Sequence, residues 1–183
     1  MRIIGGDLRG RLIEPPAGFR ARPTTDFARE GLFNILNNRF DFSDITVLDL
    51  FSGTGAVSYE FASRGSQDID LVEIESRHCS FIRKTLENLK ISTVKVHRIS
   101  VQEWLKACHK HYDIVFADPP YDISWLKDLP AMVMKSGACD EDTVFILEHP
   151  KSLDFRSYVG FTEHRNYGNV NFSFFSKTGS LRS

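Results

Sequence analysis

From residue 46 onward, short apolar runs rich in β-branched residues alternate with segments of helical periodicity. The expected strands cover residues 46–50, 69–73, 94–98, 113–117 and 143–148. The expected helices cover residues 56–64, 77–89, 101–109 and 124–135, with Ser76 as a cap and Gly65 as a stop. Because strands and helices alternate, the pattern predicts βαβ units and a parallel sheet with helices on both faces.

The last part of the sequence departs from this alternation. Two β-like runs, 158–163 and 170–175, flank Asn166-Tyr167-Gly168-Asn169, and this arrangement predicts a hairpin. Phe172 and Phe174 alternate along the second run and are expected to bury one face. The fold class that follows is α/β, a doubly wound, mostly parallel seven-stranded sheet ending in an antiparallel hairpin.

The first 40 residues form a separate extension to this pattern. Two runs, 2–4 and 10–13, flank Gly5-Gly6-Asp7 and suggest a short hairpin. After Pro23, one of Thr24, Thr25 or Asp26 is expected to cap a helix that lies against the sheet edge. Its apolar face would hold Ala28, Leu32, Ile35 and Leu36. We expect a single domain over 1–183, made of the extension 1–40 and the core 41–183.

Charge is unevenly spread along the chain. Residues 1–39 contain seven arginines and four acids, a balance of +3 that leaves −4 for the remainder of a chain with net charge −1. A basic arm on an acidic body is typical of a local phosphate-binding patch, although arginines of this kind also pair with nearby acids. No apolar run approaches the ~20 residues that cross a bilayer. The three cysteines and six histidines match no metal-ligand spacing, so we expect a cytoplasmic protein with reduced thiols, no membrane contact and no metal.

A glycine-rich turn follows the first expected strand, in the run from Val47 to Ala56. Gly53 and Gly55 permit positive φ and a close approach of a ligand to the backbone. The third glycine of the dinucleotide fingerprint is replaced by Ser58, which counts against NAD or FAD. Asp49 would repel a pyrophosphate and would suit an ammonium group.

The second expected strand ends in Val72-Glu73-Ile74-Glu75, about twenty residues beyond the glycines. Glu73 is placed to accept hydrogen bonds from both hydroxyls of a ribose, and Ile74 to pack on adenine. Glu75 is expected to cap the following helix together with Ser76. A ligand with a ribose, an adenine and a zwitterionic tail but no phosphate is S-adenosylmethionine.

The fourth strand ends in Asp118-Pro119-Pro120-Tyr121. The two prolines remove backbone donors and forbid helix, so the segment offers hydrogen-bond acceptors followed by an aromatic face. This combination suits a flat group that bears an NH2. An ordinary turn after a strand is the alternative.

Taken together, these motifs resemble the class I S-adenosylmethionine-dependent methyltransferases with a Rossmann-like fold. The N-terminal residues Arg2-Ile3-Ile4-Gly5-Gly6, Arg22-Pro23-Thr24-Thr25-Asp26 and Leu32-Phe33-Asn34 resemble the RsmD family. That resemblance implies transfer of a methyl group to the exocyclic N2 amine of a guanine in small-subunit (16S) ribosomal RNA. It also implies a monomer that acts on the RNA within a ribosomal subunit or an assembly intermediate.

The resemblance implies roles for individual residues. Asp118, Pro119 and Tyr121 would be catalytic. The cofactor would contact Asp49, Phe51, Gly53, Gly55, Glu73, Ile74, Ser100 and Asp118. The RNA would contact Arg9, Arg11, Arg20, Arg22, Pro120 and Tyr121. Ser100 departs from the family pattern, since many relatives carry Asp or Asn there to bind the adenine amine.

Three other functions agree less well with these motifs. A DNA adenine N6-methyltransferase shares the Asp-Pro-Pro-Tyr motif, but such enzymes usually carry a separate target-recognition domain. A catalytically inactive RNA-binding module of the same fold is disfavoured by the intact Gly53, Glu73 and Asp118 motifs. A Rossmann dehydrogenase is disfavoured by Ser58 and Asp49.

Overall fold

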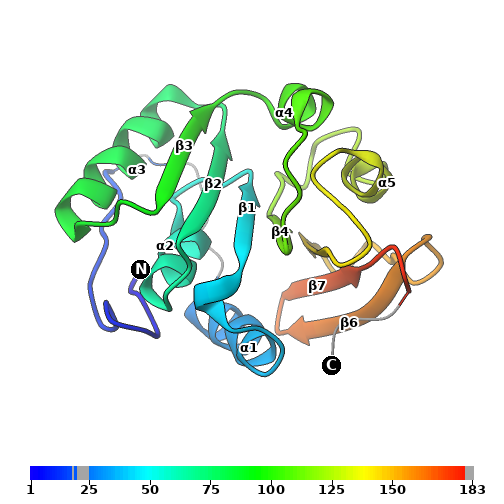
Figure 1. The fold of residues 1–183 in the computed structure, drawn as a ribbon, viewed down its shortest axis with the longest axis horizontal. Helices are drawn as coiled ribbons and strands as arrows, with labels where there is room; N and C mark the ends of the chain where they lie inside the picture. Colours follow the sequence, from blue (N-terminus) through cyan, green and yellow to red (C-terminus); the bar gives the residue numbers. More distant parts are fainter. Residues whose placement is uncertain (18, 20–24, 180–183) are drawn as a thin grey trace.

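The computed structural model describes residues 1–17, 19 and 25–179. Within this part of the chain, seven strands form one mixed sheet in the order β3-β2-β1-β4-β5-β7-β6 (Figure 1). The strands are β1 (Thr46–Leu50), β2 (Asp68–Glu73), β3 (Val94–Arg98), β4 (Ile114–Ala117), β5 (Val144–His149), β6 (Phe161–Tyr167) and β7 (Val170–Phe175). Strands β1 to β5 pair in parallel, and β7 is antiparallel to both of its neighbours. The expected fold class is therefore confirmed.

Helices cover both faces of the sheet. They are α1 (Asp26–Asn37), α2 (Ala56–Ser63), α3 (Ser76–Leu89), α4 (Val101–Ala107) and α5 (Leu129–Lys135), with a short 3-10 helix η1 (Phe42–Asp44) before β1. Alternate strand residues enter two separate apolar clusters. Val47 and Ile114 pack with α1, α2 and α3, whereas Leu48 and Val115 pack with α4 and α5. Because both faces are covered, the strands are apolar throughout rather than alternating.

Several expected boundaries and one expected cap differ in the structure. Helix α5 begins at Leu129 rather than at residue 124. Before it, the backbone N–H groups of Leu126 and Asp128 donate to the carbonyl groups of Ile123 and Trp125, each three residues earlier, and these bonds form turns instead of an α-helix. Helix α4 ends at Ala107 rather than at residue 109. The expected cap at Ser76 is wrong: Ser76 is the first residue of α3, and Glu75 precedes it without a side-chain cap bond. None of the helices in the described residues is long and apolar enough to cross a membrane.

The C-terminal hairpin is displaced from its expected position. Strand β6 runs to Tyr167, which pairs with Val170, so the turn consists of Gly168 and Asn169 alone. Gly168 has a φ of 67°, which favours glycine at that position. Tyr167 is consequently a strand residue rather than part of a turn.

The N-terminal extension folds largely as expected. Arg2 and Leu12 form an antiparallel bridge, and Thr25 caps α1 by accepting a hydrogen bond from the Ala28 N–H. Ala28, Leu32 and Leu36 are buried together with Phe33, while Ile35 is only partly buried. Helix α1 contacts β6, the edge strand, and Arg39 just beyond it pairs with Glu163 at 2.8 Å.

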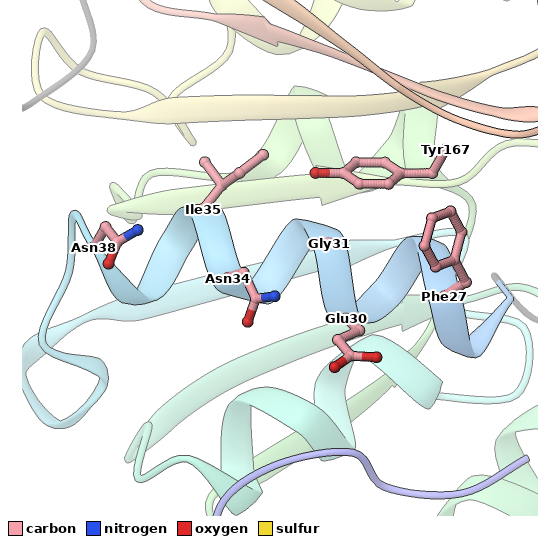
Figure 2. Close-up of a pocket in the computed structure, with 7 residues that line it drawn as sticks. All are labelled: Phe27, Glu30, Gly31, Asn34, Ile35, Asn38 and Tyr167. Atoms are coloured by element: carbon pink, nitrogen blue, oxygen red, sulfur yellow. The ribbon is translucent and has the colours of Figure 1, made fainter.

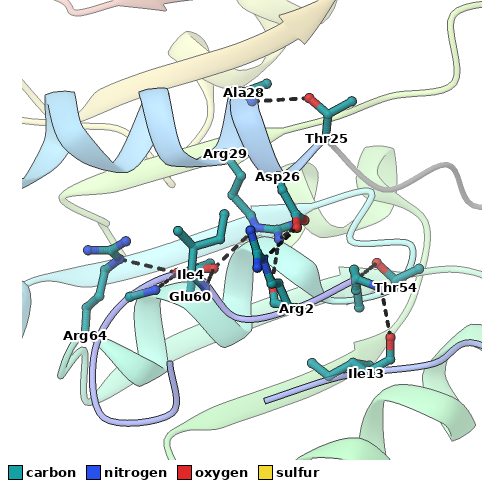
Figure 3. A network of polar contacts seen from close by, with 12 residues as sticks. Arg2, Ile4, Ile13, Thr25, Asp26, Ala28, Arg29, Thr54, Glu60 and Arg64 are labelled. Carbon is teal, nitrogen blue, oxygen red and sulfur yellow. Dashed lines mark hydrogen bonds and ion pairs between the residues drawn. The ribbon is translucent and has the colours of Figure 1, made fainter. Parts of the chain in front are cut away.

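A buried ion pair fixes this extension to α2 (Figure 3). Arg29 is 1% exposed and pairs with Asp26 at 2.8 Å and with Glu60 at 3.4 Å. The Glu60 carboxylate also accepts hydrogen bonds from the backbone N–H groups of Ile4 and Gly5. Glu60 thus satisfies a buried guanidinium and two backbone donors at once.

Candidate active site

The carboxyl ends of three parallel strands bring acidic residues together. Leu50 of β1 and Leu147 of β5 lie on either side of Ala117 of β4. Asp118 and Glu148 therefore follow at the same level on adjacent strands. Asp49 lies opposite Phe116, two residues before the level of Asp118, near the edge where open parallel sheets bind ligands.

The pKa values of Asp49 and Asp118 are both raised, chiefly by burial. Burial raises the pKa of Asp49 to about 7, with a smaller contribution from Glu73. Burial also raises the pKa of Asp118 well above its usual value, and the charges of Glu148 and Asp49 add to this effect. Mutual repulsion among these acids favours any ligand that brings a positive charge.

Asp49 lies beneath the glycine-rich turn. Its carboxylate is 1% exposed and accepts a hydrogen bond of 2.6 Å from the Ser58 hydroxyl. Because Asp49 is buried, it would act on a ligand above the turn through its charge and not by direct contact. Ser58, which stands where a dinucleotide-binding turn has its third glycine, holds this acid in place.

The turn has the backbone that its glycines predict. Gly53 and Gly55 have φ values of 55° and 79°. A Cβ at Gly55 would lie 2.8 Å from the Tyr59 ring, so both its conformation and its surroundings require glycine. Phe51 also has a positive φ of 59°, and its ring lies 5.7 Å from that of Trp125.

Glu73 ends β2 beside this turn. Its carboxylate accepts hydrogen bonds from the N–H groups of Gly53 at 2.9 Å and Glu75 at 2.8 Å. The Nδ1 atom of His78 lies 3.4 Å from the same carboxylate. A carboxylate has about four acceptor positions, so it keeps capacity for a ribose hydroxyl. Ile74 follows with 59% exposure, an apolar side chain next to the acid. These residues fit the ribose and adenine of S-adenosylmethionine.

The loop after β4 presents the predicted acceptors. Asp118 is partly exposed, Pro119 is buried, and Pro120 is exposed. Tyr121 is 46% exposed, and its hydroxyl donates to Glu148 at 3.5 Å. One face of an aromatic ring and a carboxylate therefore border the same loop.

Ser100 is engaged locally. It caps α4, where its hydroxyl donates to the Glu103 carboxylate at 2.6 Å and accepts from the Glu103 N–H at 3.2 Å. Its contact with adenine stays a prediction.

The basic arm is smaller than its composition indicates. Arg2, Arg29 and Arg39 form ion pairs with acids, so the alternative explanation is correct for these three. Arg9 and Arg11 are exposed. Arg20 and Arg22 lie outside the described residues.

Sequence reasoning assigned no role to Glu148 or Trp125. The signal for Glu148 was present, since an acid ends the apolar run next to β4. No grouping of histidine, cysteine, aspartate or glutamate in residues 1–17, 19 and 25–179 has the geometry to hold a metal ion. Cys79, Cys108 and Cys139 are buried free thiols.

The strand order, the glycine-rich turn and the acid-lined edge with its Asp-Pro-Pro-Tyr loop define a class I S-adenosylmethionine-dependent methyltransferase. Over residues 1–176 the sequence matches the family described as Conserved hypothetical protein 95, and the chain belongs to this family, the RsmD family.

Named relatives and a solved structure agree with this assignment. The chain is 33% identical over 154 residues to Ribosomal RNA small subunit methyltransferase D of Buchnera aphidicola, covering 84% of this chain and 78% of that one. It is also 33% identical over 147 residues to the protein of the same name in Escherichia coli, covering 80% and 73%. The structure of a hypothetical protein of Thermus thermophilus superposes with a TM-score of 0.84 at 30% identity, over 96% of this chain and 99% of that one.

Proposed function

We propose that this protein transfers a methyl group from S-adenosylmethionine to the exocyclic N2 amine of a guanine in small-subunit (16S) ribosomal RNA. Membership of the RsmD family makes it a ribosomal RNA methyltransferase. The observation that carries the choice of an amine is the loop after β4. There, the Asp118 carboxylate and the Pro119 carbonyl offer acceptors, and two successive prolines offer no backbone donor.

Residues on β1 and β2 would hold the cofactor. Glu73 would accept the ribose hydroxyls and Ile74 would pack on adenine, while Gly53 and Gly55 let the ligand approach the backbone beside Phe51. The negative charge of Asp49 would favour the ammonium end. When bound, S-adenosylmethionine supplies a methyl group made electrophilic by its positive sulfonium.

The amine is activated by position, because the lone pair of N2 is delocalised into the guanine ring. The Asp118 carboxylate and Pro119 carbonyl each accept one N2 hydrogen, which turns the lone pair toward the methyl group. Tyr121 stacks on the base and Pro120 borders it, so the base must leave its helix or loop to enter. Methylation releases one proton from N2, and Asp118, with its raised pKa, is the proposed acceptor.

The setting is part of the proposal. We expect a monomer in the cytoplasm, built as a single methyltransferase domain over 1–183 with the arm 1–40 and the catalytic core 41–183. The RNA would be presented within a ribosomal subunit or an assembly intermediate. Arg9 and Arg11, with Arg20 and Arg22, would contact phosphates. An arm of this size supports a substrate that is partly recognised through other components of the particle.

The test is transfer of labelled methyl to unmethylated small subunits, to the same RNA stripped of protein, and to duplex DNA, followed by identification of the methylated base. Asp118→Ala should abolish transfer, whereas Asp122→Ala, which removes an exposed carboxylate four residues away, should preserve it. Label on N2 of a guanine, lost only in the first variant, supports the proposal. Label on adenine in DNA would replace it with the DNA methyltransferase function. No transfer to any substrate would refute it.

A further inference from the structure

A groove lies between α1 and Tyr167 of the C-terminal hairpin (Figure 2). Its volume is about 470 Å³, within the range of small-ligand sites. Residues spaced three or four apart along one face of α1 form its floor, and Tyr167 of β6 forms its wall. The residues that matter are Phe27, Glu30, Asn34, Ile35, Asn38 and Tyr167.

Two aromatic rings meet at one end of this groove. Phe27 and Tyr167 have ring centroids 5.7 Å apart at an angle of 78°, and Phe27 is 66% exposed. Figure 2 shows the Tyr167 ring lying over α1 at Gly31. A Cβ at Gly31 would be 2.1 Å from that ring, so a glycine is needed for the ring to lie there. The arrangement leaves a large face of Phe27 open for stacking.

Polar groups follow the rings along α1. The side chains of Glu30, Asn34 and Asn38 are exposed, and among the described residues none of them hydrogen-bonds to another protein atom. They offer acceptors from a carboxylate and both donors and acceptors from two amides. The groove lining contains no lysine or arginine, and Glu30 brings a negative charge. A phosphate would be repelled there, whereas a nucleobase has a flat face to stack and an edge of N–H donors and acceptors to pair.

The aromatic end of the groove lies near the candidate active site. Tyr167 pairs with Val170, the next residue Asn171 lies opposite His149, and His149 follows Glu148. Since adjacent strands are ~4.8 Å apart, two strand spacings and two or three residues place Tyr167 on the order of 10 to 15 Å from Glu148. An RNA chain whose target base is held at Asp118 can thus reach the groove with a nearby nucleotide.

We propose that this groove binds a second, unpaired nucleobase of the RNA substrate, separate from the base that is methylated. The inference rests on the proposed function in taking RNA as the ligand. Phe27 stacks on the base, and Tyr167, whose ring lies at 78° to that of Phe27, meets the base edge-on. Glu30 accepts hydrogen bonds from the N–H groups of the base, so guanine, adenine and cytosine bind better than uracil, which has a single N–H donor. If the groove instead bound a segment of a ribosomal protein, any apolar side chain at position 27 would suffice, and an aromatic ring would not be required.

Binding is tested by nuclear magnetic resonance on the isotopically labelled full chain. The four ribonucleoside 5′-monophosphates are the probes, and ribose 5-phosphate is the control that has no base. The nucleotides should shift the Asn34 and Asn38 side-chain amide signals and the Gly31 backbone amide, and ribose 5-phosphate should not. Unmoved groove signals, or equal shifts with ribose 5-phosphate, would overturn the proposal.

Three variants separate stacking from apolar docking. Phe27→Ala and Phe27→Leu should each weaken nucleotide binding at the groove about 5- to 100-fold, the loss expected for one stacked base. Val159→Ala, which shortens a 97% exposed apolar side chain outside the groove, should leave binding unchanged. Phe27→Leu binding like the wild type would overturn the proposal, because an apolar contact alone would then suffice. These binding measurements do not depend on methyl transfer. If the groove binds nucleotides but no methyl group is transferred, only the proposed function is refuted. If methyl transfer occurs but the groove binds no nucleotide, only the groove proposal is refuted.

Discussion

The hydroxyl of Ser58 donates a hydrogen bond of 2.6 Å to the carboxylate of Asp49, and both side chains are buried. Ser58 occupies the position at which a dinucleotide-binding turn carries its third glycine. The bond links the helix after the turn to the strand before it, because Asp49 belongs to β1 and Ser58 to α2. The same substitution that excludes a dinucleotide therefore supports an acid under the ligand site.

Removing this bond should destabilise the protein in a pH-dependent way. Ser58→Ala is expected to cost about 1 to 3 kcal/mol at pH 8, where Asp49 is largely ionised and loses its donor. The cost should be smaller at pH 5.5, where Asp49 is protonated, since its pKa is about 7. Urea unfolding at both pH values measures this. Ser80→Ala, on the exposed face of α3, is the matched control, and equal losses at the two pH values would contradict the expected link to ionisation.

Cofactor affinity should rise with pH. The pKa of Asp49 is raised to about 7 and that of Asp118 is also raised, so both gain negative charge as pH increases from 5.5 to 7.5. Because the cofactor is cationic, calorimetry should show roughly tenfold tighter binding at the higher pH, or ~1.4 kcal/mol. Asp49→Asn should flatten this dependence, while Asp44→Asn at an exposed position should not. If the cofactor affinity of the wild-type protein did not change with pH, the charges of these two acids would not contribute to cofactor binding.

Tyr121 should act through its ring. Tyr121→Ala is expected to lower kcat/KM for RNA about 5- to 100-fold, the loss of one stacked base, while cofactor affinity stays the same. Tyr121→Phe keeps the ring and removes the hydroxyl that lies 3.5 Å from Glu148, so it should remain within about threefold of the wild type. Steady-state methyl transfer at varied RNA concentration gives both values. If the phenylalanine variant is as impaired as the alanine variant, the hydroxyl and not the ring is essential.

Glu60 should control attachment of the N-terminal arm. Glu60→Ala leaves Arg29 buried with one fewer counter-charge and releases the N–H groups of Ile4 and Gly5, at a cost of about 3 to 5 kcal/mol. Trypsin should then cut faster after Arg9 and Arg11. Glu87→Ala, at an exposed position of α3, is the control. Unchanged cleavage in Glu60→Ala would mean that the arm is held by other contacts, such as those of Ile3 and Ile13.

The sequence alone was sufficient to predict the elements that are determined by neighbouring residues in the chain. Strand β1, the glycine-rich turn and the Asp118 loop follow from residues adjacent in the chain, and the structure has them as expected. The role of Arg29 was hidden because its partner Glu60 is 31 residues away, and that of Arg39 because Glu163 is 124 residues away. Tyr167 was assigned to a turn because its packing on Gly31 is set by tertiary contact and not by turn propensity. The α5 boundary was missed because turns and helices share the same short-range bonds in their first residues.

The attachment of the arm to Glu60 also sets an order of events during translation. The ribosome releases residues 2–13 well before α2 exists, so the arm emerges without the carboxylate that its backbone donors require. Helix α1 waits longer still, since Arg39 pairs with Glu163 and Gly31 receives Tyr167 near the other end of the chain. The arm can therefore dock only after α2 has been made, and α1 completes its contacts only after the C-terminal hairpin, so the two earliest segments to be synthesised both wait for later ones.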